Sequence, residues 1–292
     1  MPNPNLSPFV IPNVITFAAG NGGLTKAVIT APRGSAEIYL HGATVTHFQP
    51  AGSDPMLWVS KTTAYDREKP IRGGVPVLFP WFGPHPQGLG QHGFARITEW
   101  NVLYTGANPD GSATVVLGMS STESTKKSFP HDFSIRYTIT VGQHLDLTFE
   151  VTNHSPNEII FEEGLHTYFR TPDIRQTEVT GLDGVTFIDK VAGDQRKVQH
   201  GPVKFPGEID WVYQDTPHTC SIYCAGQRLA TVAKEGSIST VVWNPSEAKG
   251  ESLPDLAGQW RNFVCVETVN NYDNRVKLAA GKTHTMRSII FR

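Results

Sequence analysis

Two ionisable residues stand in stretches of sequence that otherwise look like apolar strands, and the first is His166. If residues 161–169 form a strand, His166 shares one face with Glu162, Gly164 and Tyr168. A glycine beside an imidazole and an aromatic ring would let a small polar ligand approach the imidazole closely. A core histidine that is satisfied by a backbone carbonyl is the other interpretation, and this segment alone favours it.

The second ionisable residue is Glu267, within residues 262–269. The residues on both sides of this segment are apolar, so a strand here should be buried on both of its faces. A carboxylate that is buried without a partner either destabilises the fold or becomes protonated. Glu267 therefore needs a partner or a chemical task. A buried salt bridge and a strand end that emerges into solvent are the plainer alternatives.

Two arginines close to glycines suggest an anionic ligand. Arg72 directly precedes two glycines and Arg96 follows Gly93 by three residues, so little side-chain bulk would block an incoming anion. Arginine binds phosphate and carboxylate groups in a bidentate manner. Gln91 and His92 add an amide and an imidazole to the segment that contains Arg96. A turn with a surface arginine is the plainer interpretation of each segment.

Taken together, these residue types indicate general acid–base chemistry on an anionic substrate. A histidine and a buried carboxylate can exchange protons with a substrate without a metal or a cofactor. The pairs His41/His47 and His85/His92 lack the spacing of common metal sites. The sequence also lacks a phosphate-cradling glycine-rich loop of the nucleotide-binding type and a serine nucleophile elbow. We therefore expect no metal and no cofactor.

The elements that must position these residues are predicted to be strands. The 292 residues include 27 Gly and 21 Pro, which interrupt the chain too often for long helices. Residues 135–141 and 143–151 both alternate apolar and polar side chains and meet at Gly142, so we expect a hairpin. Short strands between turn signals indicate an all-β sandwich or barrel, most simply one large antiparallel domain. The other predicted strands are residues 36–40, 95–104, 113–117, 185–188, 237–243, 262–269 and 283–291.

The composition excludes several classes of protein. The chain has 25 Lys+Arg and 27 Asp+Glu, a formal net charge of −2, which argues against a nucleic-acid groove and a polybasic membrane surface. It contains no run of about 18 apolar residues, and its first eight residues do not resemble a signal peptide. Three cysteines cannot form a disulfide framework and fit a reducing compartment. We expect a cytoplasmic protein with no nucleic-acid or membrane partner, whose residues 1–10 form a flexible tail.

Seven short motifs follow one another along nearly the whole chain. They are residues 71–76 (IRGGVP), 79–83 (FPWFG), 90–96 (GQHGFAR), 165–169 (LHTYF), 187–190 (FIDK), 242–245 (VWNP) and 264–267 (VCVE). In this order they resemble the D-hexose-6-phosphate mutarotases, also called glucose-6-phosphate 1-epimerases, of the galactose mutarotase-like superfamily. The match is specific because it depends on all seven motifs in this order and not on any one of them.

The resemblance implies one all-β domain over residues 1–292, an antiparallel β-supersandwich of the galactose mutarotase-like type. It also implies a cofactor-free isomerase that acts on a small-molecule hexose phosphate, and we expect a monomer rather than an oligomer. The family's catalytic histidine and glutamate correspond to His166 and Glu267. Its substrate contacts correspond to Arg72, Gln91, His92, Arg96 and Asp210.

The chemistry of this family is the exchange of α and β anomers through opening of the sugar ring. Glu267 as a carboxylate would take the proton of the C1 hydroxyl, and His166 as an imidazolium would protonate the ring oxygen. With ordinary pKa values of about 4.3 and 6.5, the two residues would support each other as a charged pair at neutral pH. An aldose 1-epimerase for neutral sugars and a non-catalytic carbohydrate-binding sandwich are the alternatives. Residues 246–254 depart from the family pattern near the expected pocket rim, which leaves the preferred sugar open.

Overall fold

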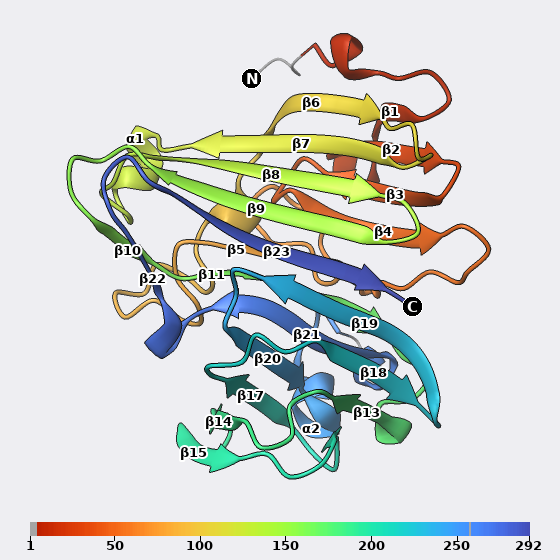
Figure 1. Ribbon diagram of the computed structural model, residues 1–292, viewed down its shortest axis with the longest axis vertical. Coiled ribbons are helices and arrows are strands. Elements are labelled where there is room, and N and C mark those ends of the chain that lie inside the picture. Colours follow the sequence, from red (N-terminus) through yellow and green to blue (C-terminus); the bar gives the residue numbers. More distant parts are fainter. Residues whose placement is uncertain (1–4, 257) are drawn as a thin grey trace.

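The computed structural model describes residues 5–256 and 258–292, and strands dominate it (Figure 1). These residues form one sheet of nine strands, one of eight, one of four and one of two. Every ladder between the named strands is antiparallel. The expected all-β, antiparallel fold is therefore confirmed.

The nine-stranded sheet runs through the molecule in the order β16-β13-β18-β19-β23-β9-β8-β7-β6. The predicted hairpin is confirmed as β8 and β9, in which Val141 pairs with Leu145. The strands of this sheet are β6 (Asn101–Ala107), β7 (Ala113–Ser120), β8 (Phe133–Val141), β9 (Leu145–Asn153), β13 (Thr177–Thr180), β16 (Val203–Lys204), β18 (Cys220–Cys224), β19 (Gln227–Glu235) and β23 (Thr283–Phe291).

The eight-stranded sheet carries the predicted site and has the order β15-β14-β17-β20-β21-β11-β5, with β12 also paired to β21. Strands β14, β15 and β17 lie at the end of the molecule opposite β6 and β7 (Figure 1). The strands of this sheet are β5 (Val77–Leu78), β11 (Glu163–Leu165), β12 (Tyr168–Arg170), β14 (Thr186–Asp189), β15 (Gln195–Val198), β17 (Ile209–Tyr213), β20 (Ser239–Asn244) and β21 (Phe263–Asn270).

The remaining elements are short. The four-stranded sheet is a meander of β1 (Ile15–Ala19), β2 (Thr25–Ala31), β3 (Gly34–Tyr39) and β4 (Thr44–Pro50). The two-stranded sheet pairs β10 (Ile159–Phe161) with β22 (Val276–Leu278). The described α-helices are α1 (Glu123–Lys126) and α2 (Ser246–Ser252), and neither has the length and apolar character needed to cross a membrane.

Strand β21 separates the core from the site. All eight of its residues are buried, which confirms the prediction that both of its faces are covered. Val264 and Val266 pack into the main core, and Thr268 Oγ1 on the same face donates to Ser288 Oγ of β23 at 3.1 Å. Glu267 alternates with these residues and therefore points to the opposite side of the sheet.

Two predicted strands are interrupted. In residues 95–104 the chain first makes a 3₁₀ turn, η3 (Ala95–Ile97), and β6 begins only at Asn101. Side chains stabilise this turn, since Trp100 Nε1 donates to the Ala95 carbonyl at 3.0 Å and Thr98 Oγ1 donates to the Phe94 carbonyl at 2.8 Å. Residues 161–169 are divided among β10, β11 and β12, with residues 166–167 between strands.

The expected tail is shorter than ten residues. Residues 1–4 lie outside the described part of the chain. Ser7–Phe9 forms the 3₁₀ turn η1, and Leu6 and Phe9 pack against the main core. Thr105 Oγ1 of β6 also donates to the Phe9 carbonyl at 2.8 Å, so residues 6–9 are held against the sheet.

The buried side chain of Lys234 on β19 predicts that the stability of the fold depends on pH. Its Nζ donates to the Ser239 carbonyl at 2.6 Å and to Thr240 Oγ1 at 2.7 Å. Burial lowers the pKa of Lys234 from 10.5 to about 7. Between these two values the unfolded chain binds one more proton than the folded chain, so stability rises with pH. The burial cost is complete below pH 7 and absent above pH 10.5.

We therefore predict that Lys234→Met makes stability less dependent on pH. The wild-type free energy of unfolding should rise between pH 7 and 9 by up to about 1.4 kcal/mol per pH unit more than that of the variant. Urea unfolding of both proteins at pH 7, 8 and 9 measures this difference. Parallel pH profiles would contradict the prediction.

Candidate active site

The predicted site residues converge on a cavity of about 230 Å³ beside β20 and β21. Arg96 is not in the wall, but its Nη2 donates to the carbonyl of the wall residue Gln91 at 2.8 Å. The structure therefore brings all seven predicted residues into one region. The six that line the cavity are Arg72, Gln91, His92, His166, Asp210 and Glu267.

His166 and Glu267 form a close pair in this cavity. Their Nε2 and Oε1 atoms are 3.3 Å apart, and only 9% and 2% of the two side chains is exposed. His166 Nδ1 and Glu267 Oε2 are buried and have no hydrogen-bond partner among the described residues. Buried polar atoms without partners are rare in native proteins. These two atoms therefore suggest a site for a ligand or a reaction.

The register of the sheet places the two residues opposite each other. Leu165 of β11 pairs with Thr268, and Tyr168 of β12 pairs with Cys265. Continued across the break between β11 and β12, this register sets His166 opposite Glu267. The His166 backbone N–H donates to the Pro76 carbonyl at 3.0 Å instead. The break thus leaves the imidazole at the edge of the cavity while the neighbouring pairs hold its position.

Burial controls the protonation of the pair. It lowers the pKa of His166 well below its usual value, and the charges of Arg96 and Arg72 lower this pKa further. Burial also raises the pKa of Glu267 well above its usual value, and the Asp210 carboxylate adds to this rise. The free pocket therefore favours an imidazole and a protonated carboxyl group. Burial therefore acts against the charged pair that ordinary pKa values suggest.

Arg72 is linked to His166 through Tyr168. Arg72 Nη1 donates to Tyr168 Oη at 3.2 Å, and the Tyr168 ring stacks on His166 with centroids 4.7 Å apart and an angle of 8°. Arg72 Nε also donates to Asp255 Oδ2 at 2.7 Å. Hydrogen bonds to Tyr168 and Asp255 thus hold the guanidinium on two sides.

His92 is a hydrogen-bond donor toward the cavity. The Gly83 N–H donates to its Nδ1 at 3.2 Å, which assigns the ring proton to Nε2. Burial lowers the pKa of His92 well below its usual value, and the charge of Arg96 acts in the same direction. A neutral His92 therefore offers Nε2–H to an oxygen atom of a ligand.

The two glycines after Arg72 serve packing rather than anion access. A Cβ at Gly73 would lie 2.5 Å from the Trp58 carbonyl oxygen, and one at Gly74 would lie 2.1 Å from that of Val45. Both residues have positive φ, 119° and 68°. They let the segment with Arg72 run between the Trp58 backbone and β4, which fixes where the guanidinium enters the cavity.

Comparison with known proteins shows the family of the chain. The family model described as "Aldose 1-epimerase" matches residues 25–290. The chain belongs to the aldose 1-epimerase family. An Escherichia coli relative named "Putative glucose-6-phosphate 1-epimerase" is 36% identical over 271 residues, covering 91% of this chain and 90% of the relative. A Cenchrus ciliaris relative of the same name is 32% identical and covers 84% and 78%.

A solved structure supports the same membership. The crystal structure titled as a "putative mutarotase (YeaD)" from Salmonella typhimurium superimposes with a TM-score of 0.89 at 30% identity. The match covers 97% of this chain and 95% of that one. The galactose mutarotase-like fold that the sequence suggested is therefore confirmed.

Several side chains at the site of this family member were not predicted. Residues 246–254, which depart from the family pattern, do reach the rim as expected, since Lys249 of α2 and Leu253 line the cavity. Lys190 and Trp243 also line it, and both lie in sequence motifs that the resemblance had used. Asp255 carries no sequence signal, because its contact with Arg72 joins residues 183 positions apart.

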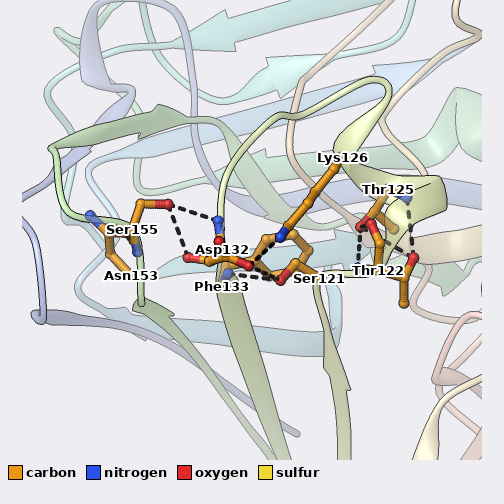
Figure 2. A network of polar contacts seen from close by, with 8 residues as sticks. All are labelled: Ser121, Thr122, Thr125, Lys126, Asp132, Phe133, Asn153 and Ser155. Carbon is orange, nitrogen blue, oxygen red and sulfur yellow. Dashed lines mark hydrogen bonds and ion pairs between the residues drawn. The ribbon is translucent and has the colours of Figure 1, made fainter.

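Two larger hollows contain neither His166 nor Glu267. They measure about 380 and 620 Å³. The smaller of them lies beside a polar network in which Lys126 Nζ and Asp132 Oδ1 are 2.7 Å apart and the Asp132 N–H donates to Ser155 Oγ at 2.7 Å (Figure 2). These contacts tie the loop between α1 and β8 to its neighbours, so the network has a structural role.

Glu162 holds two loops of the site together. Its Oε2 accepts from the Phe82 N–H and its Oε1 from the Tyr272 N–H, both at 2.8 Å. Lys190 Nζ lies over both aromatic rings, 5.4 and 5.9 Å from their centroids. Glu162 therefore connects the backbones of the two loops that carry Phe82 and Tyr272.

We predict that Glu162→Gln lowers kcat/KM because an amide NH₂ then faces one of the two backbone N–H groups. Losing one hydrogen bond to a charged group costs about 1.5–3 kcal/mol, or about 10- to 150-fold. Glu158→Gln, at an exposed position, is the matched control. Steady-state rates that are equal in both variants would contradict this role for Glu162.

Proposed function

We propose that this protein interconverts the α and β anomers of hexose 6-phosphates by opening and reclosing the sugar ring. The observation that carries the proposal is the buried His166–Glu267 pair, whose unpartnered atoms lie beside one cavity. The names of the relatives agree with this activity. The pair supplies an acid and a base, and the two nearby arginines supply positive charge for a phosphate.

The reaction moves two protons and one bond. Glu267 takes the proton of the C1 hydroxyl, the electron pair forms the C1 carbonyl, the bond from C1 to the ring oxygen breaks, and His166 protonates that oxygen. The open aldehyde rotates about C1–C2 and closes on its other face as both protons return. At the open-chain stage the pair is neutral. Burial favours that state of the pair, so ring opening is not opposed by the protein.

The position of the arginines fits a phosphate on C6. C5 carries both the ring oxygen and C6, so a group on C6 lies on the same side of the sugar as the ring oxygen. If His166 meets the ring oxygen, the phosphate lies toward Arg72 and Arg96, whose charges both act on His166. Arg72 retains Nη2 and Arg96 retains Nε and Nη1 without a recorded partner among the described residues.

The other wall suits the hydroxyl groups of the sugar. Asp210 lies on β17 opposite Trp243 of β20, and the Lys190 N–H donates to the Asp210 carbonyl at 3.0 Å. Burial raises the pKa of Asp210, while the charge of Lys190 opposes the rise. We assign Asp210 to accept hydrogen bonds from sugar hydroxyls, with Gln91 and His92 as further contacts.

A neutral-sugar aldose 1-epimerase is the second candidate. The ion pair between Asp255 and Arg72 favours it, because it already offsets one of the two positive charges. NMR exchange between the anomeric proton signals of glucose 6-phosphate and of glucose, with and without protein, tests both candidates. We expect the phosphosugar to exchange faster. Faster exchange of glucose would favour the second candidate, and no effect on either sugar would leave a binding protein.

We also propose that the reaction needs neither a metal nor a cofactor. The described residues contain no group of three or more His, Cys, Asp or Glu side chains that could hold a metal ion. We expect catalysed exchange to be unchanged after exhaustive chelation. Activity that disappears on chelation and returns with a divalent ion would contradict this. The three described cysteines are free and buried, which suits a reducing compartment. We propose that the protein acts in the cytoplasm and as a monomer.

A further inference from the structure

The state of the free pocket raises a question about how ring opening begins. His166 must carry a proton to protonate the ring oxygen, whereas burial and the charges of Arg96 and Arg72 all disfavour its protonated form. The Glu267 carboxyl group is 3.3 Å away, and its burial favours the protonated form. An added negative charge near the arginines would move that proton to His166.

One route from the arginines to His166 runs through Tyr168. Arg72 donates to Tyr168 Oη at 3.2 Å, and the tyrosine ring stacks on the imidazole with centroids 4.7 Å apart. Tyr168 is 1% exposed, so no solvent separates the guanidinium from the imidazole along this path. A charge that binds Arg72 therefore acts on His166 through a medium of low dielectric constant.

A second route runs through the segment that contains His92. Arg96 Nη2 donates to the Gln91 carbonyl at 2.8 Å. The ring of the next residue, His92, packs against the His166 ring in a T-shaped arrangement with centroids 5.8 Å apart. The charge of Arg96 disfavours the protonated forms of both histidines. An anion that neutralises the charge of Arg96 would thus raise the pKa of both His92 and His166.

We propose that an oxyanion bound at Arg72 and Arg96 activates the His166–Glu267 pair and does not only hold the substrate. The inference rests on the proposed function and makes a separate claim. A free dianion that is not attached to the sugar should accelerate the exchange of neutral hexose anomers. The phosphate of a phosphosugar then contributes to the rate of ring opening as well as to affinity.

Asp255 sets the strength of this response. Its Oδ2 lies 2.7 Å from Arg72 Nε, so a carboxylate of the protein already offsets part of the charge that a dianion would meet. Asp255 is half-buried at the rim, three residues after α2 ends. Removing its charge should let the dianion bind at a lower concentration.

The experiment measures anomer exchange of glucose by NMR at constant ionic strength while phosphite replaces chloride. Exchange caused by phosphite without protein is subtracted. We expect a saturable increase in catalysed exchange of roughly tenfold, because the bound dianion offsets the arginine charges that disfavour protonated His166. In Arg72→Ala the increase should disappear. In Asp255→Asn, whose site keeps both arginines, it should saturate at lower phosphite concentration.

The outcomes separate this inference from the proposed function. If wild-type protein exchanges glucose 6-phosphate but phosphite leaves glucose exchange unchanged, the activation is overturned and the function stands. Activation that persists in Arg72→Ala, or that saturates at the same phosphite concentration in Asp255→Asn, also overturns it. If glucose 6-phosphate itself is not exchanged, the proposed function fails first.

Discussion

Replacing Glu267 by glutamine should lower the catalysed exchange of glucose 6-phosphate anomers by at least about 100-fold, because a positioned acid or base contributes about 10²–10⁴-fold. Glutamine preserves the shape of the side chain and removes the carboxylate that we propose as the base for the C1 hydroxyl. His166→Ala removes the partner 3.3 Å away and should cause a loss of similar size. NMR exchange spectroscopy with each purified variant measures both losses.

A buried glutamate on the neighbouring strand provides the control. Glu163 of β11 accepts from Asn270 Nδ2 at 2.9 Å and lies 2.8 Å from His284 Nε2. Glu163→Gln should lower the unfolding temperature while the folded protein still exchanges anomers. Glu267→Gln should keep or raise the unfolding temperature, because burial disfavours the Glu267 carboxylate and its one recorded polar side-chain contact is with His166, whereas Glu163 has two partners. Near-wild-type exchange in Glu267→Gln would refute its assignment as the base.

The strands could be predicted where packing is simple. In β8 and β9 one face meets the core and the other meets solvent, so apolar and polar side chains alternate in the sequence. In β21 both faces are covered, so all of its residues are buried. Its first four residues are therefore all apolar, and polar residues occur only in its second half. Residues 95–104 misled the prediction because side-chain contacts from Thr98 and Trp100 stabilise a turn.

The roles of the acidic residues could be predicted only in part. Glu162, Glu163 and Glu267 all occur among apolar neighbours in the sequence. Their roles differ because their partners come from distant segments: backbone N–H groups of two loops for Glu162, and His284 for Glu163. Glu267 was distinguished by the family resemblance, and the structure adds that it lies opposite His166.

The protonation of the pair also required the structure. Ordinary pKa values suggest a charged pair, and only the depth of burial shows that both charged forms are disfavoured. Burial depends on how β20, β21 and the loops around Phe82 and Leu253 close over the pair. No local pattern in the sequence reports that arrangement.

Arg72 and Arg96 should determine how strongly the protein prefers phosphosugars to neutral sugars. A hydrogen bond to a charged group contributes about 1.5–3 kcal/mol, so loss of one arginine should lower kcat/KM for glucose 6-phosphate by roughly 10- to 150-fold. The loss for glucose should be much smaller, because glucose has no phosphate to bind. Measuring kcat/KM for both sugars in Arg72→Ala and Arg96→Ala gives the change in preference.

The two variants should not be equal. Arg72→Ala leaves Asp255, now without its partner at 2.7 Å, beside the place where the phosphate would bind, and its negative charge repels the phosphate. Arg96→Ala leaves only the Gln91 carbonyl without its donor. Arg72→Ala should therefore cause the larger loss, and adding Asp255→Asn to it should restore part of that loss. Equal losses on both sugars would show that the arginines hold the loops instead, which would make a neutral-sugar epimerase the better assignment.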